Sequence, residues 1–274
     1  MITISIIIPT YNRAELLCRS LKSVIAQTFT DWEILVIDDL STDNTKTMTE
    51  RIISEYNLTE KLFYRLLEKK SGGAAARNVG INMSRGKFIA FLDDDDEWLP
   101  DKLQKQIDCV KNEVFGICYT GREIVRNGNT VAGFGKRYTF RQPPGDNHLK
   151  EIMKDNFIGV TSSVLIPKSV LLEIDGFDEN LPCLQDYDLF IRILHSYKAI
   201  GIGEPLVRYY VESSTRHVSF TRENVQKASA YFSEKYKDSP YRNLLRKAVI
   251  IINIRKMLKS FVYAKEVIVH FIKK

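Results

Sequence analysis

The chain has 274 residues, of which 44% are hydrophobic and 11% aromatic, enough for one large globular domain or for one domain with an extension. Its four cysteines lie far apart and form no C-x-x-C pair, which argues against a disulfide framework or a zinc site. The formal charge of +6 is concentrated in residues 241–274, where Glu266 is the single acid. The body of the chain therefore carries no signal for nucleic-acid binding.

The N-terminal segment carries no targeting signal. Its apolar run before Pro9 is short and lacks a leading positive charge, so it predicts neither a signal peptide nor a membrane span. Together with the scattered cysteines, this favours a reduced setting, and we expect a cytoplasmic protein.

The first hundred residues alternate between two kinds of pattern. β-branched runs at 4–8, 32–38 and 87–92 predict strands, and helical periodicity over 14–26 and 42–56 predicts helices between them. Because these strands are apolar throughout, they predict an α/β fold with a mostly parallel central sheet flanked by helices.

Beyond Pro100 the pattern is less regular. We expect a loop over 121–145, and we expect strands over 115–120 and 159–167 and helices over 101–111, 169–177 and 186–197. Residues 213–219 predict a boundary or a mobile loop, and the remainder is predicted to be helical. This suggests a catalytic or binding domain over 1–215 and a basic helical extension over 216–274.

Polar clusters follow three of the predicted strands: PTYNR at 9–13, DDLSTDNT at 38–45 and DDDD at 93–96. In a parallel sheet, ligands bind beyond the carboxyl ends of the strands, so these clusters should converge. Two carboxylates about 4 Å apart repel by about 4 kcal/mol at an effective dielectric near 20, so the aspartate row calls for a cation. Mg²⁺ and Mn²⁺ prefer such oxygen ligands.

Each cluster also has a purely structural interpretation. Acids at a strand end are often solvated turn residues or helix caps, and Asp96 and Glu97 could cap the helix predicted near Pro100. Asp39 could accept the N–H of a nucleobase, whereas the residues after it are ordinary N-cap types. Arg77, after a run of small residues, could bind phosphate through its fork of donors, or the run could be a helix start packed on the sheet.

Five segments together resemble the family 2 glycosyltransferases of GT-A fold, which is Rossmann-like, over roughly residues 3–215: SIIIPTYNR, EILVIDDLSTDNT, GGAAARNVGI, FIAFLDDDDEWLP and GFDENLPCLQDYDLFIRI. The resemblance implies an inverting, metal-dependent enzyme that uses a nucleotide-sugar, with UDP-sugar as the expected donor and Mn²⁺ or Mg²⁺ as the ion. It implies a glycan or lipid-linked glycan as acceptor and says nothing of the sugar. No P-loop and no G-x-G-x-x-G motif competes with it.

The resemblance also implies residue roles on the donor side. The nucleotide would be bordered by the turn after the first strand and by Asp39, Arg77 and the acidic row; the residues concerned are Pro9, Tyr11, Arg13, Asp39, Arg77, Asp93 and Asp94. Asp93 and Asp95 match the family's D-x-D as metal ligands, with Asp93 or Asp94 nearer the ribose. Which of the four aspartates does which is left open.

Asp186 matches the family's general base, although Gln185 stands where the family commonly has Glu. A single displacement assisted by such a base inverts the anomeric centre and needs no second, nucleophilic carboxylate. From the residues alone, Asp186 or Asp188 could equally be the N-cap of the helix predicted there.

The tail and two other functions remain open. The apolar stripe over 250–262 predicts a basic amphipathic helix that lies on an anionic membrane or packs on the catalytic domain or a partner subunit. The oligomeric state is left open. The competing functions are a nucleotidyltransferase, whose glycine- and arginine-rich first loop is missing, and a non-catalytic nucleotide-sugar or membrane-associated scaffold of the same fold.

Overall fold

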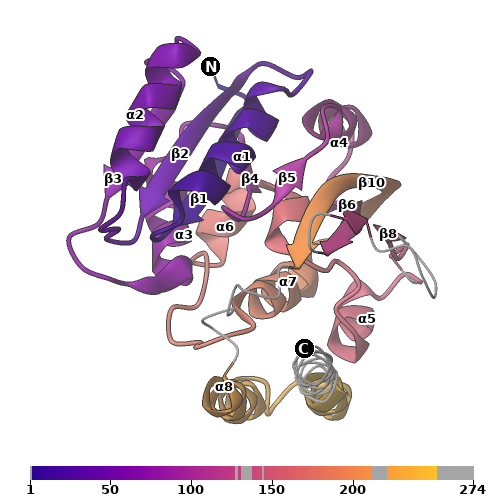
Figure 1. Ribbon diagram of the computed structural model, residues 1–274. Coiled ribbons are helices and arrows are strands. Elements are labelled where there is room, and N and C mark those ends of the chain that lie inside the picture. Colours follow the sequence, from indigo (N-terminus) through magenta and orange to yellow (C-terminus); the bar gives the residue numbers. More distant parts are fainter. Residues whose placement is uncertain (1, 127–128, 131–137, 144, 212–220, 252–274) are drawn as a thin grey trace, which may run out of the picture.

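The computed structural model describes residues 2–126, 129–130, 138–143, 145–211 and 221–251 (Figure 1). Ten strands of this part form one sheet, in which β7 and β8 pair with β6 and the others follow the order β3-β2-β1-β4-β9-β6-β10-β5. The strands are β1 (Ile4–Thr10), β2 (Trp32–Asp38), β3 (Leu62–Leu66), β4 (Phe88–Phe91), β5 (Glu97–Trp98), β6 (Ile117–Arg126), β7 (Asn129–Thr130), β8 (Tyr138–Thr139), β9 (Val164–Pro167) and β10 (Ala199–Val211).

The first half of the sheet is parallel, as the apolar strands predict. β1 pairs in parallel with β2 and β4, and β2 with β3. β9 then runs antiparallel to both β4 and β6, and β10 is parallel to β6. The polar segments after β1, β2 and β4 therefore share one edge of the sheet.

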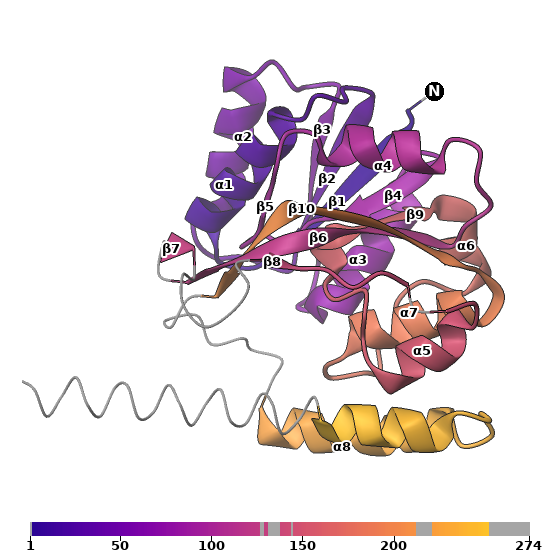
Figure 2. The ribbon, with the colours of Figure 1, turned by 90° about the vertical axis from the view of Figure 1, so that its right-hand side faces the viewer.

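Helices cover both faces of the sheet (Figures 1 and 2). Ile4, Ile6 and Ile8 of β1 pack with one set of helices, and Ile7 packs with the other, following the two-residue period of a strand. The first set is α1 (Ala14–Ile25), α2 (Thr45–Glu55) and α4 (Lys102–Val110); the second is α3 (Gly72–Met83), α5 (His148–Lys154), α6 (Lys168–Glu173) and α7 (Gln185–Ser196). This is the three-layer α/β arrangement predicted.

α8 (Arg222–Lys235) and a helical stretch up to residue 251 lie beneath α5 and α7 (Figure 2). The ring of Phe232 stacks on that of Tyr187 with centroids 5.9 Å apart, which joins α8 to the main core. The expected division at residue 215 falls outside the described residues, as does most of the 250–262 stripe. Within the described residues, no helix is both long and apolar enough to span a membrane.

Two of the expectations for the middle of the chain are wrong. Residues 121–145 are not all loop, because β6 continues to Arg126 and pairs with the short strands β7 and β8. Residues 159–167 are not one strand, because Thr161–Ser163 form a 3₁₀ turn and β9 begins at Val164. Both departures place side chains near the acidic row.

Candidate active site

The segments after β1, β2 and β4 do converge. Thr10 Oγ1 donates to Asp94 Oδ2 at 2.8 Å, which ties the end of β1 to the acidic row. The side chain of Asn12 accepts the backbone N–H of Thr42 at 2.7 Å, and the backbone N–H of Asn12 donates to Ser41 Oγ at 2.8 Å, which ties the loop after β1 to the loop after β2. The prediction that the polar clusters meet at one edge is confirmed.

The four aspartates divide into two kinds. The row turns tightly, with the N–H of Asp96 donating to the carbonyl of Asp93 at 3.0 Å. The side chains of Asp93 and Asp95 are 28% and 18% exposed, whereas that of Asp94 is 7% exposed and Asp96 is fully buried. The two carboxylates that reach solvent are those of the expected D-x-D pair.

Guanidinium groups supply the positive charge that the row needs. Nη1 of Arg13 lies 3.0 Å from oxygens of both Asp94 and Asp95, and Nη2 of Arg77 lies 2.5 Å from Asp93. Burial raises the pKa of Asp94 to about 6, and the charge of Arg13 opposes that rise. Arg13 and Arg77, expected to contact the nucleotide, therefore also stabilise the acidic row.

Asp96 and Glu97 are not helix caps, contrary to one of the expectations. Oδ2 of Asp96 accepts from Ser162 Oγ at 2.6 Å and Oδ1 accepts from the N–H of Tyr210 at 3.3 Å. Burial raises the pKa of Asp96 well above its usual range, and the charges of Asp95 and Asp93 raise it further. Glu97 accepts from the Tyr210 hydroxyl at 2.7 Å, and α4 begins only at Lys102. Asp96 is thus a buried residue whose hydrogen bonds to Ser162 and Tyr210 hold the acidic row in place.

The fit to a divalent cation rests on Asp93 and Asp95. In the described part of the chain no three His, Cys, Asp or Glu side chains gather in a way that would hold an ion. Two exposed carboxylates nevertheless fit Mg²⁺ or Mn²⁺, which commonly binds to one or two carboxylates and completes its shell with substrate phosphates and water. The residues present therefore suit an ion that is also coordinated by a diphosphate. They do not form a site in which protein ligands alone surround the ion.

The structural interpretation of the small residues is correct, because they form the start of α3, whereas that of the cluster around Asp39 is wrong, because the N-cap of α2 is Asn44. Both oxygens of Asp39 accept backbone N–H groups at the start of α3, from Ser71 at 2.6 Å and Gly72 at 2.9 Å. α3 packs so closely on the sheet that a Cβ at Gly80 would lie 2.5 Å from Ile7. This packing places Arg77 against the row. Contact of Asp39 with a base stays a prediction.

The first loop presents an aromatic ring at the edge of the site. Tyr11 is 36% exposed, with Nζ of Lys70 lying 3.5 Å from the centroid of its ring. Pro9, two residues earlier, is partly exposed at the end of β1. Their contact with a nucleotide stays a prediction.

Asp186 and Asp188, which the sequence leaves equivalent, differ sharply in surroundings. Asp188 is fully buried and bound by Arg192 at 2.7 Å and by the hydroxyl of Tyr236 at 2.7 Å. Asp186 is partly exposed in the first turn of α7, whose N-cap is Leu184, so neither aspartate is the N-cap. Gln185 donates to the carbonyl of Leu181. Asp188 is therefore structural, whereas Asp186 is partly exposed, and its role as a general base stays a prediction.

Backbone strain gathers in the loops of this site. Three non-glycine residues with positive φ, namely Asn12 (52°), Leu40 (71°) and Leu184 (63°), lie within two residues of Arg13, Asp39 and Asp186 respectively. Such a conformation costs about 1–3 kcal/mol and persists where surrounding contacts enforce it.

Sequence reasoning missed Arg122 and the 3₁₀ turn. Thr161 Oγ1 donates to Asp93 at 3.2 Å and Ser162 holds Asp96, so the turn supports the row from the far side. Arg122, on β6, is influenced electrostatically by both Asp96 and Asp186, which links the row to the expected base. The alternation of polar and apolar residues in GREIVR, residues 121–126, could have predicted the second half of β6. The glycines and polar residues around it favoured a loop instead.

Comparison with known proteins agrees with this geometry. The family model described as "Glycosyl transferase family 2" matches residues 5–175, and that described as "Glycosyltransferase like family 2" matches residues 143–239. The chain belongs to glycosyl transferase family 2. This family 2 chain is 31% identical over 214 residues to the Escherichia coli UDP-Glc:alpha-D-GlcNAc-diphosphoundecaprenol beta-1,3-glucosyltransferase WfgD, covering 77% of this chain and 78% of WfgD.

Two solved structures share the fold of this family 2 glycosyltransferase. S. aureus TarS 1-349 in complex with UDP-GlcNAc matches with a TM-score of 0.67 at 20% identity, covering 89% of this chain and 70% of that one. The mannosyltransferase PcManGT from Pyrobaculum calidifontis, in complex with GDP-Man and Mn²⁺, matches with a TM-score of 0.64 at 19% identity, covering 91% and 68%. The GT-A fold is thereby confirmed.

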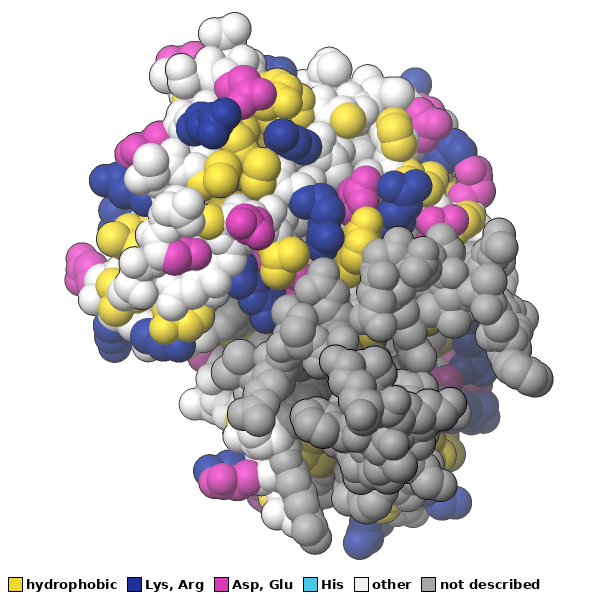
Figure 3. All heavy atoms as spheres, in the orientation of Figure 1, with side chains coloured by type: hydrophobic (Ala, Val, Ile, Leu, Met, Phe, Trp, Pro, Cys, Tyr) yellow, Lys and Arg dark blue, Asp and Glu magenta, His cyan; other side chains and the backbone are white. Residues whose placement is uncertain are grey.

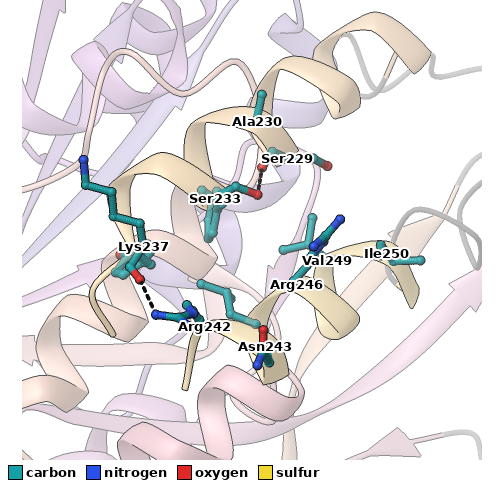
Figure 4. Close-up of a pocket in the computed structure, with 12 residues that line it drawn as sticks. Ser229, Ala230, Ser233, Lys237, Arg242, Asn243, Arg246, Val249 and Ile250 are labelled. Atoms are coloured by element: carbon teal, nitrogen blue, oxygen red, sulfur yellow. Dashed lines mark hydrogen bonds between the residues drawn. The ribbon is translucent and has the colours of Figure 1, made fainter. Parts of the chain in front are cut away.

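A groove of about 750 Å³ lies away from this site, between α8 and the helical stretch that ends the described residues (Figure 4). Lys237, Arg242 and Arg246 line it, together with apolar side chains that include Phe232 and Val249. Elsewhere, the face drawn in Figure 3 intersperses basic with acidic side chains and shows no continuous basic surface on its described part.

Proposed function

We propose that this family 2 glycosyltransferase moves a sugar, with inversion, from a nucleoside diphosphate to a hydroxyl of a glycan or lipid-linked glycan acceptor. The observation that carries the proposal is the division of the acidic row, in which Asp93 and Asp95 face solvent and Asp94 and Asp96 are buried. The named ligands of TarS and PcManGT and the named substrates of WfgD support a nucleotide-sugar donor. We take UDP-sugar as the first donor to test.

On the donor side, Tyr11 and Pro9 would border the nucleotide and Asp39 would face its base. Arg77 stands beside Asp93, where its remaining donors can bind a phosphate oxygen. Asp93 and Asp95 would hold Mn²⁺ or Mg²⁺, which when bound would neutralise the charge that develops on the leaving diphosphate. Because Arg13 now binds Asp95, it would share that carboxylate with the ion.

On the acceptor side, Asp186 would take the proton from the attacking hydroxyl. Its partial exposure in the first turn of α7 lets a substrate reach it, whereas the buried Asp188 is already bound by three side chains. A general base of this kind contributes about 10²–10⁴-fold to rate. One displacement assisted by one base predicts inversion at the anomeric carbon.

The experiment that tests the proposal is a thermal-shift screen of nucleotide-sugars with and without Mn²⁺. A ligand that binds the native state at about 100 times its Kd stabilises it by about 2.7 kcal/mol. We expect a Mn²⁺-dependent shift for one donor class, lost in Asp95→Asn and kept in Asp186→Asn. Asp186→Asn should lose sugar transfer, and normal turnover by that variant would refute the role of Asp186.

The same screen distinguishes the non-catalytic alternative. A scaffold of this fold would bind UDP without Mn²⁺ dependence and would not slowly hydrolyse the donor. Donor hydrolysis that requires Mn²⁺ and Asp95 would exclude that alternative.

A second proposal concerns the partner of residues 241–274, which we infer to be an anionic membrane surface. The groove in Figure 4 favours it, because Lys237, Arg242 and Arg246 line the groove and, of these three, only Lys237 is paired to an acid of the described residues, Glu234, and because Ile250 of the same groove is 48% exposed. Each basic residue near an anionic surface contributes about 1 kcal/mol. Co-sedimentation with vesicles containing anionic lipid should fall when these three residues become Gln, and should not fall when three exposed lysines elsewhere are changed.

A further inference from the structure

The guanidinium of Arg122 packs against the backbone of Gly159, where no side chain is present. Arg122 lies on β6, and its guanidinium packs on Gly159 so closely that a Cβ there would be 1.6 Å from Nη1. Gly159 has φ +103°, a conformation that L side chains rarely adopt. Glycine at position 159 is therefore required both by the local turn and by the arginine above it.

The guanidinium of Arg122 is an exception among the arginines around this site. Arg13, Arg77, Arg192 and Arg208 each lie within 3.1 Å of a carboxylate oxygen. No described residue gives the side chain of Arg122 a hydrogen bond or an ion pair. Burial lowers its pKa, and Tyr209, Asp96 and Asp186 oppose this from beyond contact distance. The side chain is thus partly desolvated without direct compensation.

No nitrogen of Arg122 is among the buried, unpaired polar atoms of the described residues, so its donors stay in contact with solvent and open to a ligand. If Arg122 served only to balance nearby acids, a close pair like that of Arg192 with Asp188 at 2.7 Å would be expected. An anion from outside the chain would supply the missing partner. The planar fork of arginine suits a carboxylate or a phosphate.

The position of Arg122 indicates which part of a substrate such an anion would belong to. Gly159, beneath the guanidinium, is two residues from Thr161, whose hydroxyl contacts Asp93 of the row. Asp186 is near enough for its charge to oppose the lowering of the Arg122 pKa by burial. Arg122 therefore lies near the turn that contacts the acidic row, whereas Arg13 and Arg77 are already paired with the row.

We propose that Arg122, seated on Gly159, binds an anionic group carried by a substrate at the point of transfer, distinct from the diphosphate that leaves. The group is a carboxylate or phosphate, borne either by the transferred sugar or by the acceptor. This inference rests on the proposed function, since it takes the row as the donor side and Asp186 as the acceptor side.

Two binding arms distinguish the sources, each measured by calorimetry with Mn²⁺ present. In the donor arm, UDP-glucuronate is compared with UDP-glucose; in the acceptor arm, glucose 1-phosphate is compared with methyl glucoside on protein saturated with UDP. We expect the wild type to prefer the anionic member in one arm by on the order of tenfold or more, as for a charge-assisted hydrogen bond.

The variants make the test specific to Arg122. Arg122→Gln should abolish the preference, and Arg122→Lys should restore only part of it. Gly159→Ala should also reduce it, because the new Cβ displaces the guanidinium while the arginine remains. Arg141→Gln, the same charge change at an exposed arginine, should leave it intact. Unchanged thermal unfolding in Arg122→Gln shows that the fold is retained.

Three results would overturn the inference: no anion preference in either arm, a preference that survives Arg122→Gln, or an equal loss of affinity for UDP itself. The last would make Arg122 a ligand of the leaving diphosphate. Failure of UDP and Mn²⁺ to bind the wild type would instead refute the proposed donor. The two failures are therefore distinguishable.

Discussion

Replacing Asp188 with Asn should destabilise the protein without touching the chemistry, whereas Asp186→Asn should do the reverse. Asp188 is fully buried and accepts from Arg192, Tyr236 and Lys235 at 2.7, 2.7 and 2.8 Å. Removing one partner of a buried ion pair costs about 3–5 kcal/mol. In Asp188→Asn, the cations left behind can still reach solvent, because Arg192 and Lys235 are 19% and 24% exposed, and Lys235 still pairs with Asp178 at 2.5 Å. We therefore expect the free energy of unfolding to fall by an amount at the lower end of this range, about 3 kcal/mol.

The measurement is urea unfolding, with the midpoint shifting and the slope unchanged, and it should correspond to a fall in Tm of about 6–12 °C. Asp186→Asn, on the same helix two residues earlier, is the matched control and should unfold within about 0.5 kcal/mol of wild type. An Asp188→Asn protein as stable as wild type, or a larger loss in Asp186→Asn, would refute the division of roles between the two aspartates.

Three further predictions follow from buried groups. Burial lowers the pKa of Lys102 to about 7, so between pH 7 and about 10 the unfolded chain binds a proton at Lys102 that the folded chain does not. Stability should therefore rise with pH in this range. The difference in unfolding free energy between wild type and Lys102→Met should increase by up to about 1.4 kcal/mol per pH unit. Gly80→Ala should lower the free energy of unfolding, measured in urea, by about 1–3 kcal/mol, because the new Cβ would lie 2.5 Å from Ile7. Ser162→Ala should cost about 1–3 kcal/mol in the same assay by removing the hydroxyl that binds Asp96.

The sheet core was predictable because its signal is local. β1, β2 and β4 are continuous apolar runs, and α1 shows the spacing of Leu17, Leu21 and Val24 that a buried helix face requires. The end of each strand then locates the polar clusters without any knowledge of tertiary contacts. The convergence of the loops could be predicted for this reason, whereas the choice of Asp93 and Asp95 within the row rests on the resemblance to the family.

What could not be predicted depends on contacts between distant segments. β10 was missed because Gly201, Gly203 and Pro205 interrupt its pattern, and its pairing with β6 shifts register around Pro205. Without β10, nothing in the sequence shows that the N–H of Tyr210 would bind Asp96. The sequence alone therefore predicts a helix cap at Asp96, whereas the structure shows a fully buried carboxylate.

The buried half of the row, Asp94 and Asp96, fixes the position of the exposed half, Asp93 and Asp95. Thr10 from β1, Ser162 from the 3₁₀ turn and Tyr210 from β10 each bind Asp94 or Asp96, so three distant segments hold the turn between them. Burying these carboxylates is unfavourable, as their raised pKa values show, yet it leaves Asp93 and Asp95 little freedom to turn away. If Asp93 and Asp95 bind a cation with a diphosphate, as proposed, a site held in this way would lose little entropy on binding. Metal affinity should therefore depend on residues that never touch the metal, and Ser162 is the first of these to examine.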